Sequence, residues 1–534
     1  MTTHTTDPTA PPTDAVPRRG LSELDEPERY RAFDDLQCLM PGVWDAMRQD
    51  LDDESVVVVP SVSLERTTAS TGTLTQAMEE RALFQVLLLR QPRLRMVYVS
   101  SMPVSEAILE YYLGLLPGVI PSHARSRLTM VSVGDATPTP LSAKLLARPR
   151  LLSQVRAHVP NPARSHLIFY NVTDLERDVA LSLGLPLYGS DPRMAALGSK
   201  SGCRRIFEEL GVRCPAGAED LHSADDIVTA VLGMRRKRPS LQEAIVKLND
   251  GVSGSGNAML DLRGLPEPGS PEEAASVTQR LQGLRPESDE ISVADFLAAF
   301  ERGGGIVEER IVGVQLTSPS VQMRAAPDGT VELLSTHDQL LGGPTGQAYL
   351  GCVFPADPAY AALITEPAMA VGQHLAGLGV LGRFAVDFVV VQDESGTWTP
   401  YAIELNLRKG GTTHPFLTLQ FLTNGTYDGR TGTYLTAGGV PKYLVATDHL
   451  EDERLKALSV ADLFDLVATR GLHFDQSHEK GIVFHMISCL TECGRLGMTA
   501  VGDSPEDAWE LYQRAQVLLL EEAERAAAER PLVR

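Results

Sequence analysis

The chain has 534 residues, 43% of them hydrophobic, which is enough for about three domains with packed cores. Its formal net charge of −21 argues against a nucleic-acid partner, because affinity for a phosphate backbone requires a basic surface. No apolar run approaches the roughly 20 residues that a membrane-spanning helix requires, so we expect no membrane partner.

The first 20 residues are rich in Thr, Pro and Asp and lack the apolar segment of a signal peptide, so residues 1–20 are predicted to be a disordered tail. The six cysteines are irregularly spaced and include no CxxC pair. This pattern supports neither a disulfide framework nor a zinc knuckle. We therefore expect a protein of the reducing cytoplasm.

Residues 21–188 form the first predicted domain. Short segments rich in Val, Ile and Tyr alternate there with longer amphipathic ones such as 73–90, and this alternation predicts a parallel sheet with helices on both faces. None of the strands is followed by a G-x-G-x-x-G sequence, so the Rossmann-like region shows no dinucleotide fingerprint. The predicted strands are residues 55–60, 95–100, 127–133 and 166–172.

Residues 189–434 begin with a helix that ends at Gly211 and then become rich in β-strands, and residues 435–534 form a smaller mixed region with a charged closing helix. The fold class predicted for the whole chain is therefore α/β, with an α+β domain in the middle.

A glycine-rich segment, VKLNDGVSGSGNA, occupies residues 246–258. Its lysine, Lys247, precedes the glycines, so the segment is not a Walker A loop. Because strands are predicted on both sides, we interpret it as a flap whose N–H groups can face anionic oxygens, with Lys247 at its base. A mobile surface hairpin is the alternative interpretation.

Two strand-like segments, 384–391 (FAVDFVVV) and 399–406 (TPYAIELN), are separated by a turn-rich linker, which predicts a hairpin. If the bend centres between Ser395 and Gly396, a carboxylate of the first strand lies directly opposite a carboxylate of the second.

These two carboxylates are Asp387 and Glu404, and Asn406 shares their face of the sheet. Buried neighbouring carboxylates repel each other and are costly to desolvate, so they require a cation. A set of oxygen ligands that includes an amide suits Mg²⁺ rather than zinc. Alternatively, one carboxylate caps the turn or faces solvent.

Five motifs in this order resemble those of the ATP-grasp enzymes, which are carboxylate–amine and carboxylate–thiol ligases. They are Lys200 in GSKSGCRRIFEELGVRCPAG, Lys247 before the flap, VEERI (307–311), Asp387 and ELN (404–406). Four further segments resemble the pheganomycin-type peptide ligases: VVVVPSVSLE, STHDQ (335–339), ELNLRKGGTTHP, and the closing stretch from 481 to 509. The resemblance implies a Rossmann-like pre-ATP-grasp domain, a two-lobed ATP-grasp domain and a small C-terminal α/β domain.

The resemblance also implies the nucleotide site. Lys200 and Lys247 are expected to contact the α- and β-phosphates of ATP, and Gly254, Ser255 and Gly256 to lie in the flap over the phosphates.

Adenine is expected to bind at the hinge Glu308–Ile311, which includes Glu309. The hinge is expected to recognise adenine largely through its backbone groups. D-alanine ligases place a ribose-binding carboxylate after this hinge. The corresponding position here is Gln315, which departs from that pattern and leaves Glu309 as the alternative ribose contact.

By the same resemblance, Asp387, Glu404 and Asn406 hold two Mg²⁺ ions, and Arg408 stabilises the transferred phosphoryl group or the acyl phosphate. Substrate contacts are expected from Gly410, Gly411 and His414. Arg324 is a further candidate for catalysis or substrate contact, and His337 and Gln339 are candidates for contact alone; an exposed strand charge and a turn are the competing interpretations.

The expected activity is that of an ADP-forming peptide ligase. It joins the carboxylate of a small, non-proteinogenic amino acid or guanidino acid to the N-terminal amine of a peptide through an acyl phosphate. Two alternatives stay open: an ATP-grasp amide or dipeptide synthetase for an ordinary metabolite, and a nucleotide-binding scaffold without catalysis. The base for the amine is not identified, and a homodimer is left open.

Overall fold

A computed structural model describes residues 21–49, 54–64, 72–251, 256–288, 291–343 and 346–529. The chain divides into two compact units, one formed by residues 1–63 and 85–192 and the other by residues 64–84 and 193–534. Residues 64–84, which the sequence analysis grouped with the predicted domain 21–188, thus group with the second unit. Within the described residues, no helix has both the length and the apolar character needed to cross a membrane.

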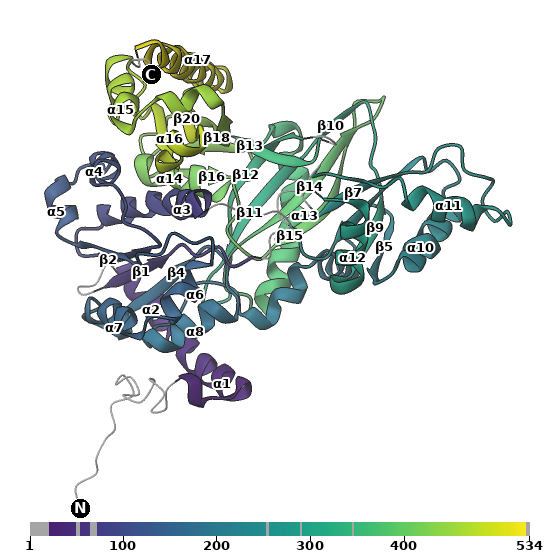
Figure 1. Ribbon diagram of the computed structural model, residues 1–534, viewed down its shortest axis with the longest axis horizontal. Coiled ribbons are helices and arrows are strands. Elements are labelled where there is room, and N and C mark those ends of the chain that lie inside the picture. The colour runs from purple at the N-terminus through teal and green to yellow at the C-terminus, as the bar shows by residue number, and fades with distance from the viewer. Residues whose placement is uncertain are drawn as a thin grey trace, which may run out of the picture. The chain divides into compact units, whose positions relative to one another are not determined.

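The first unit is built on a parallel four-stranded sheet with the order β3-β2-β1-β4 (Figure 1). This confirms the predicted strands and their parallel pairing. Strands β1 and β4 are almost completely buried, as expected for strands of a parallel sheet. The strands are β1 (Ser55–Val59), β2 (Arg95–Ser100), β3 (Leu128–Ser132) and β4 (Ser165–Phe169). The helices are α1 (Glu26–Gln37), α2 (Met40–Gln49), α4 (Glu106–Gly114), α5 (Pro121–Arg125), α6 (Leu141–Leu146), α7 (Pro149–Ala157) and α8 (Asp174–Leu183).

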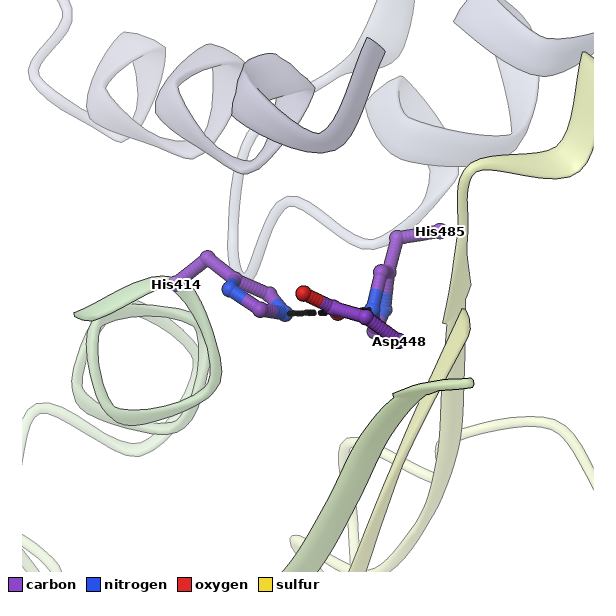
Figure 2. A group of neighbouring side chains, drawn as sticks. All are labelled: His414, Asp448 and His485. Atoms are coloured by element: carbon purple, nitrogen blue, oxygen red, sulfur yellow. Dashed lines mark hydrogen bonds and ion pairs between the residues drawn. The ribbon is translucent and has the colours of Figure 1, made fainter. Parts of the chain in front are cut away.

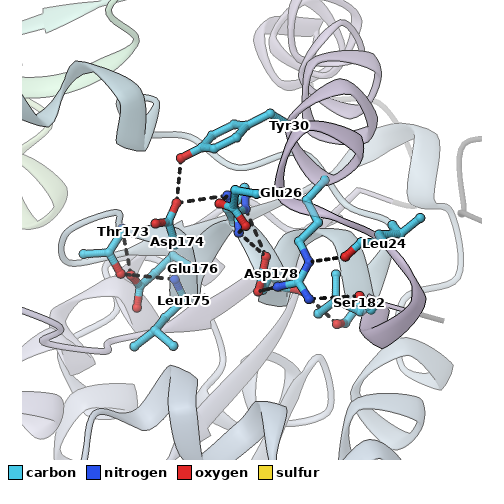
Figure 3. A network of polar contacts seen from close by, with 12 residues as sticks. Leu24, Glu26, Tyr30, Thr173, Asp174, Leu175, Glu176, Asp178 and Ser182 are labelled. Atoms are coloured by element: carbon cyan, nitrogen blue, oxygen red, sulfur yellow. Dashed lines mark hydrogen bonds and ion pairs between the residues drawn. The ribbon is translucent and has the colours of Figure 1, made fainter.

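A network of charged side chains joins α1 to α8 (Figure 3). Arg177 on α8 has a side chain only 1% exposed and lies 2.8 Å from the carboxylate of Asp178. Arg29 on α1 binds the same carboxylate at 2.8 Å, and the hydroxyl of Tyr30 donates to Asp174 at 2.6 Å. The contacts of Arg29 and Tyr30 thus hold helix α1 against α8 within the first unit.

The second unit contains an antiparallel sheet with the order β5-β9-β6-β7-β8 (Figure 1). Helices α10, α11 and α12 pack against it, and their apolar residues share one core with those of β6, β7 and β9. The strands are β5 (Gly217–Leu221), β6 (Glu243–Leu248), β7 (Asn257–Asp261), β8 (Arg285–Pro286) and β9 (Gly305–Glu309). The helices are α10 (Ala224–Lys237), α11 (Glu273–Leu281) and α12 (Val293–Gly303).

A nine-stranded sheet forms the other part of the second unit, in the order β10-β14-β11-β12-β13-β18-β20-β19, with β15 also paired to β14. Helices α9 and α13 cover a core formed with β11, β14 and β15. The strands are β10 (Gln315–Thr317), β11 (Pro319–Ala325), β12 (Val331–Gly342), β13 (Ala348–Phe354), β14 (Gly382–Gln392), β15 (Trp398–Asn406), β18 (Tyr443–Glu451), β19 (Gly481–His485) and β20 (Arg495–Gly502). The helices are α9 (Lys200–Glu209), α13 (Pro358–Gly377) and α14 (Thr413–Thr423), and β16 (Thr426–Asp428) pairs with β17 (Thr433–Leu435).

Residues of the predicted C-terminal region continue this same sheet, because β13 pairs antiparallel with β18 and β18 with β20. The elements around these strands are α15 (Val460–Thr469), α16 (Leu490–Cys493) and α17 (Pro505–Glu529).

Helix α3 (Gly72–Glu80), followed by a 3₁₀ helix (Arg81–Arg90), corresponds to the amphipathic segment 73–90. The carboxylate of Glu80 accepts hydrogen bonds from the backbone N–H groups of Ile487 (2.5 Å) and Ser488 (3.3 Å). These contacts explain why residues 64–84 belong to the second unit.

Candidate active site

Asp387 on β14 and Glu404 on β15 are direct partners in the antiparallel ladder, which confirms the predicted pairing. The ladder reaches this pairing through an irregularity. Near the turn Gln392 pairs with Trp398, and Phe388 pairs with Ala402. One extra residue, a β-bulge, then brings Glu404 opposite Asp387.

Each of these carboxylates has its own polar partners. The hydroxyl of Ser320 donates to Asp387 Oδ1 at 2.6 Å, and the amide of Asn406 donates to Asp387 Oδ2 at 3.1 Å. The ammonium of Lys200 lies 2.6 Å from Glu404 Oε1. The three predicted metal ligands and the first predicted phosphate-binding lysine are therefore neighbours.

The two carboxylates differ in their pKa values. Burial, and after it repulsion by Glu404, raises the pKa of Asp387 to about 6. Burial also favours the neutral form of Glu404, but the ammonium of Lys200 outweighs this and lowers the pKa of Glu404. The ammonium of Lys200 thus compensates the negative charge of Glu404, whereas a negative charge on Asp387 remains unfavourable.

A row of polar residues crosses four strands at this level of the sheet. His337 on β12 pairs with Ser320 on β11, Ser320 pairs with Asp387, and Asp387 pairs with Glu404. Sequence analysis did not identify Ser320 or Gln322, whose amide donates to the Ser320 hydroxyl at 2.9 Å. The available signal was the alternation of polar residues in SPSVQ.

His337 is fully buried, and burial lowers its pKa to about 3. Its Nε2 lies 2.9 Å from the hydroxyl of Ser335, and its ring packs against Phe354 at a centroid distance of 5.0 Å. A strand therefore carries this residue, which the competing interpretation assigned to a turn.

The predicted flap lies between β6 and β7, which pair antiparallel with Lys247 opposite Asn257. Leu248 N–H donates to the carbonyl of Gly256 at 2.9 Å and closes the base of the hairpin. Gly254 and Ser255 fall outside the described residues. The hairpin itself agrees with the interpretation of the glycine-rich segment as a connection between strands.

Lys247 and Glu308 form a buried ion pair in which the lysine side chain is 6% exposed and the glutamate 2%. Arg204 on α9 lies 3.5 Å from the other oxygen of Glu308. Glu308 therefore brings a predicted phosphate-binding lysine and helix α9 together at strand β9.

The remaining hinge residues are placed differently. Glu309 accepts from the N–H of Ala216 at 3.0 Å and pairs with Arg238. Ile311 follows β9, and Gln315 is exposed at the start of the edge strand β10. The side chain of Glu309 is thus already engaged by protein groups.

Strand β15 leads into the loop that carries the predicted phosphoryl-binding and substrate-binding residues. Arg408 donates to the carbonyl of Lys409 at 3.3 Å, and Gly410 N–H donates to Thr413 Oγ1 at 2.9 Å. Gly411 is in close contact with Tyr349, because a Cβ at Gly411 would lie 2.5 Å from the tyrosine ring. The loop therefore requires a glycine at position 411. The loop leads into helix α14, which carries His414.

Arg324 lies on β11 four residues beyond Ser320, about 13 Å along an extended strand, and pairs with Arg383 of β14. Its guanidinium forms an ion pair with Glu332, and its side chain is 25% exposed. The residue is thus a strand charge, as the competing interpretation held, but it is only partly exposed.

The donor set fits magnesium and a nucleotide. Asp387, Glu404 and the Asn406 side chain offer oxygen ligands, and the unfavourable charge on Asp387 would be relieved by a divalent cation. Lys200 and Lys247, which are held here by carboxylates, offer the positive charge that phosphates require.

Two family models match the chain. The IQCH-like ATP-grasp model matches residues 192–283 and 289–430, which contain Lys200, Lys247, Asp387 and Glu404 and the strands that carry the site. The model of the PGM1 C-terminal domain matches residues 462–515.

Two curated proteins are similar along most of the chain. L-propargylglycine–L-glutamate ligase of Streptantibioticus cattleyicolor is 30% identical over 449 residues, which cover 82% of this chain and 89% of that ligase. IQ motif-containing protein H of Danio rerio is 24% identical over 480 residues, which cover 80% of this chain and 44% of that longer protein.

Solved structures share the fold at low sequence identity. The biotin carboxylase domain of the Hydrogenobacter thermophilus 2-oxoglutarate carboxylase, crystallised with MgADP, ADP and bicarbonate, has a TM-score of 0.52 and 11% identity, covering 88% of this chain and 94% of that chain. An ADP complex of N5-carboxyaminoimidazole ribonucleotide synthetase has a TM-score of 0.50 and 10% identity, covering 88% of this chain and 98% of that chain.

Proposed function

Because the chain belongs to the ATP-grasp carboxylate–amine ligases, we propose that it joins the carboxylate of a small, non-proteinogenic amino acid to the N-terminal amine of a peptide. The reaction consumes ATP, releases ADP and phosphate, and serves the biosynthesis of a peptide natural product. The similarity to L-propargylglycine–L-glutamate ligase supports an amino-acid donor and natural-product chemistry.

The reaction proceeds in two steps. A carboxylate oxygen of the donor attacks the γ-phosphorus of ATP, the bond to ADP breaks, and an acyl phosphate forms. The acceptor amine then attacks the acyl carbon, phosphate leaves, and the amine loses a proton. Activation is needed because direct attack on a carboxylate would have to expel an oxide, and the protein contributes mainly by positioning and by neutralising charge.

In this proposal Asp387, Glu404 and Asn406 hold two Mg²⁺ ions, which supply the charge that offsets the phosphates. Lys200 and Lys247 bind the α- and β-phosphates. The observation that carries the proposal is the direct pairing of Asp387 with Glu404 beside Lys200, because it places acidic ligands and a basic group at one site.

Roles for the surrounding residues follow. We assign Arg408 to the transferred phosphoryl group and the N–H groups of Gly410 and Gly411 to the donor carboxylate. His414, the expected substrate contact, is buried with its Nε2 facing Asp448 and His485, so we assign it to positioning this loop and not to contact with substrate. The flap that includes Gly254, Ser255 and Gly256 would cover the phosphates and exclude water, which would otherwise hydrolyse the acyl phosphate.

The hinge Glu308–Ile311 is assigned to adenine through its backbone. Gln315 is the preferred ribose contact, because it is exposed whereas Glu309 is already held by Ala216 and Arg238.

Residues 189–434 are proposed as the ATP-grasp domain, with 21–188 before it and 435–534 after it. Cytoplasmic location is supported by the few, irregularly spaced cysteines.

A single amino acid is the second candidate for the acceptor. The name of the Streptantibioticus cattleyicolor ligase pairs two amino acids, and this favours an acceptor without further residues for that protein. A homodimer is compatible with either acceptor and is tested by light scattering of the purified chain.

The test measures ADP release with a panel of amino-acid donors, each offered glutamate, dipeptides and tripeptides as acceptors, with product masses recorded. ADP formation that requires both a carboxylate and an amine is expected, with a product mass equal to the sum of the two less one water. AMP in place of ADP, or no nucleotide turnover across the panel, would overturn the proposal. The product masses also decide between a peptide and an amino-acid acceptor.

A further inference from the structure

Three side chains from distant parts of the chain converge in the second unit, outside the Asp387–Glu404 site. They are His414 on α14, Asp448 on β18 and His485 on β19, and Figure 2 shows the carboxylate between the two rings. The two Nε2 atoms lie 3.1 Å apart. Asp448 Oδ1 lies 2.7 Å from Nε2 of His485 and 3.2 Å from Nε2 of His414, and all three side chains are at most 7% exposed.

We propose that His414, Asp448 and His485 bind one divalent transition-metal ion of the zinc class through the two Nε2 atoms and Oδ1. Bonds of about 2.0–2.1 Å in tetrahedral geometry place neighbouring ligand atoms about 3.3 Å apart. Two of the three observed separations are close to that value. The third is shorter, as expected where a hydrogen bond joins two atoms that a metal would hold apart.

The carboxylate of Asp448 is oriented for this role by a second partner. Its other oxygen, Oδ2, is bound by the guanidinium of Arg81, whose side chain is 7% exposed. One oxygen therefore faces the arginine and the other faces both imidazole nitrogens. Such outer partners fix the orientation of metal-binding carboxylates.

Glu80 fixes the segment that follows His485. Its buried carboxylate is bound by the N–H groups of Ile487 and Ser488, two and three residues beyond His485. This ligand of the cluster is therefore held from the chain that follows it as well as by its own strand.

The fold makes room for the ring of His485. An added Cβ at Gly497, on the neighbouring strand β20, would lie 2.2 Å from Nε2 and Cδ2 of His485. Gly497 pairs with His485 in the ladder, so a side chain here would displace the ring from the cluster.

The ligand types separate this site from the proposed magnesium site. Two imidazoles and one carboxylate suit Zn²⁺ or Co²⁺, whereas Mg²⁺ prefers oxygen ligands alone. Bound metal would join the first turn of α14, just after the Gly410–Gly411 loop, to strands β18 and β19. The ion would thus hold the start of this helix in place, and the inference does not depend on the proposed reaction.

The test uses the untagged full chain, stripped with a chelator and then titrated with Zn²⁺ and separately with Co²⁺, both in excess Mg²⁺. We expect one equivalent of either ion to bind despite the Mg²⁺, and Co²⁺ to give the visible absorption bands of a nitrogen- and oxygen-bound ion of low coordination number. If the chain binds neither ion under these conditions, the proposal is wrong.

Substitutions of the proposed ligands, with Co²⁺ affinity as the measurement, test where the ion binds. His414→Asn and His485→Asn should each weaken Co²⁺ binding by at least about 100-fold, and Gly497→Ala should weaken it while removing no ligand. His374→Asn, on α13, is the matched control and should bind as the native chain does. Circular dichroism verifies that each variant folds. Equal Co²⁺ affinity in the folded ligand variants and the control would place the ion elsewhere and overturn the proposal.

The magnesium site can fail or succeed independently. Asp387→Asn is expected to lose turnover and to keep the Co²⁺ bands, so failure of the proposed reaction leaves this second test intact.

Discussion

Lys200 at the first position of α9 forms an ion pair with Glu404 near the end of β15, with 2.6 Å between Nζ and Oε1. The pairing joins a lysine expected at a phosphate to a carboxylate expected at a metal. When nucleotide and Mg²⁺ bind, Lys200 would exchange the carboxylate of Glu404 for a phosphate, and Glu404 would exchange the ammonium of Lys200 for a magnesium ion. The ion pair thereby keeps both groups compensated before the nucleotide binds.

Asp387→Asn should reduce ADP release by at least about 100-fold, because it removes one of two carboxylates proposed to hold Mg²⁺. The same change removes the repulsion from Glu404 that, together with burial, raises the pKa of Asp387 to about 6. The melting temperature should therefore be unchanged or higher.

Glu404→Gln should also abolish turnover while the chain remains folded. Unchanged turnover in either variant contradicts the metal assignment.

Glu308→Gln should lower the free energy of unfolding by about 3 kcal/mol, because it leaves the buried Lys247 and Arg204 without this counter-charge. Urea denaturation measures the loss. Arg205→Ala is the matched control, since Arg205 pairs with Asp220 at the surface, with side chains 51% and 54% exposed. That change should cost less than about 1 kcal/mol. Similar losses in the two variants would show that burial of the Glu308 pairs does not matter for stability.

Asp338→Asn should flatten the pH dependence of stability between about pH 4 and pH 6. Burial raises the pKa of Asp338 to about 6, whereas an unfolded chain has a value near 3.9. The folded state therefore holds its proton more tightly, and its stability falls as pH rises through this window, by on the order of 3 kcal/mol at most. In the native chain the hydroxyl of Tyr360 donates to Asp338 Oδ1 (2.8 Å) and the N–H of Asp357 donates to Oδ2 (2.9 Å). Asparagine keeps the bond from Asp357 through its single carbonyl oxygen, and its NH2 group can donate to the Tyr360 oxygen instead. Unfolding curves of both proteins at several pH values test this, and parallel pH profiles would refute it.

Gly411→Ala should slow turnover by at least about 10-fold, because its Cβ would lie 2.5 Å from the Tyr349 ring and displace the loop proposed to bind the donor carboxylate. Tyr349→Ala in the same chain should restore part of the activity by making room. Steady-state kinetics of the two single variants and the double variant provide the measurement. If the rate reductions of the two single variants simply multiply in the double variant, the contact between Gly411 and Tyr349 does not determine the position of the loop.

The sequence predicted the strand pairs at the centre of the site because their side chains alternate strongly. Asp387 lies between Val386 and Phe388 in the apolar stretch FAVDFVVV, so the hairpin pattern indicated which face of the sheet it occupies. The bend does not centre between Ser395 and Gly396 as predicted, because Gln392 pairs with Trp398. Asp387 lies opposite Glu404 only because a β-bulge shifts the register, and no local pattern in the sequence indicates this bulge.

Residues that meet through tertiary packing could not be inferred in the same way. Asp448 and His485 lie on strands separated by helix α15, and no pattern in the sequence links these two positions to each other or to His414. Arg81 reaches Asp448 from a segment more than 350 residues earlier, with a sequence separation of 367. Sequence periodicity describes one strand or helix at a time, so it carries no information on which elements converge.

The hydrogen-bonded continuity from β13 through β18 to β20 has a consequence for exchanging parts between related ligases. A junction placed near residue 435, at the predicted end of the ATP-grasp region, would cut across a single sheet and would have to match the edge of β13 in the recipient. A chimera that transplants the terminal segment without that edge would expose unpaired N–H and C=O groups, which invite association between molecules. Recombination should therefore succeed more often when β13 travels together with the strands that follow it.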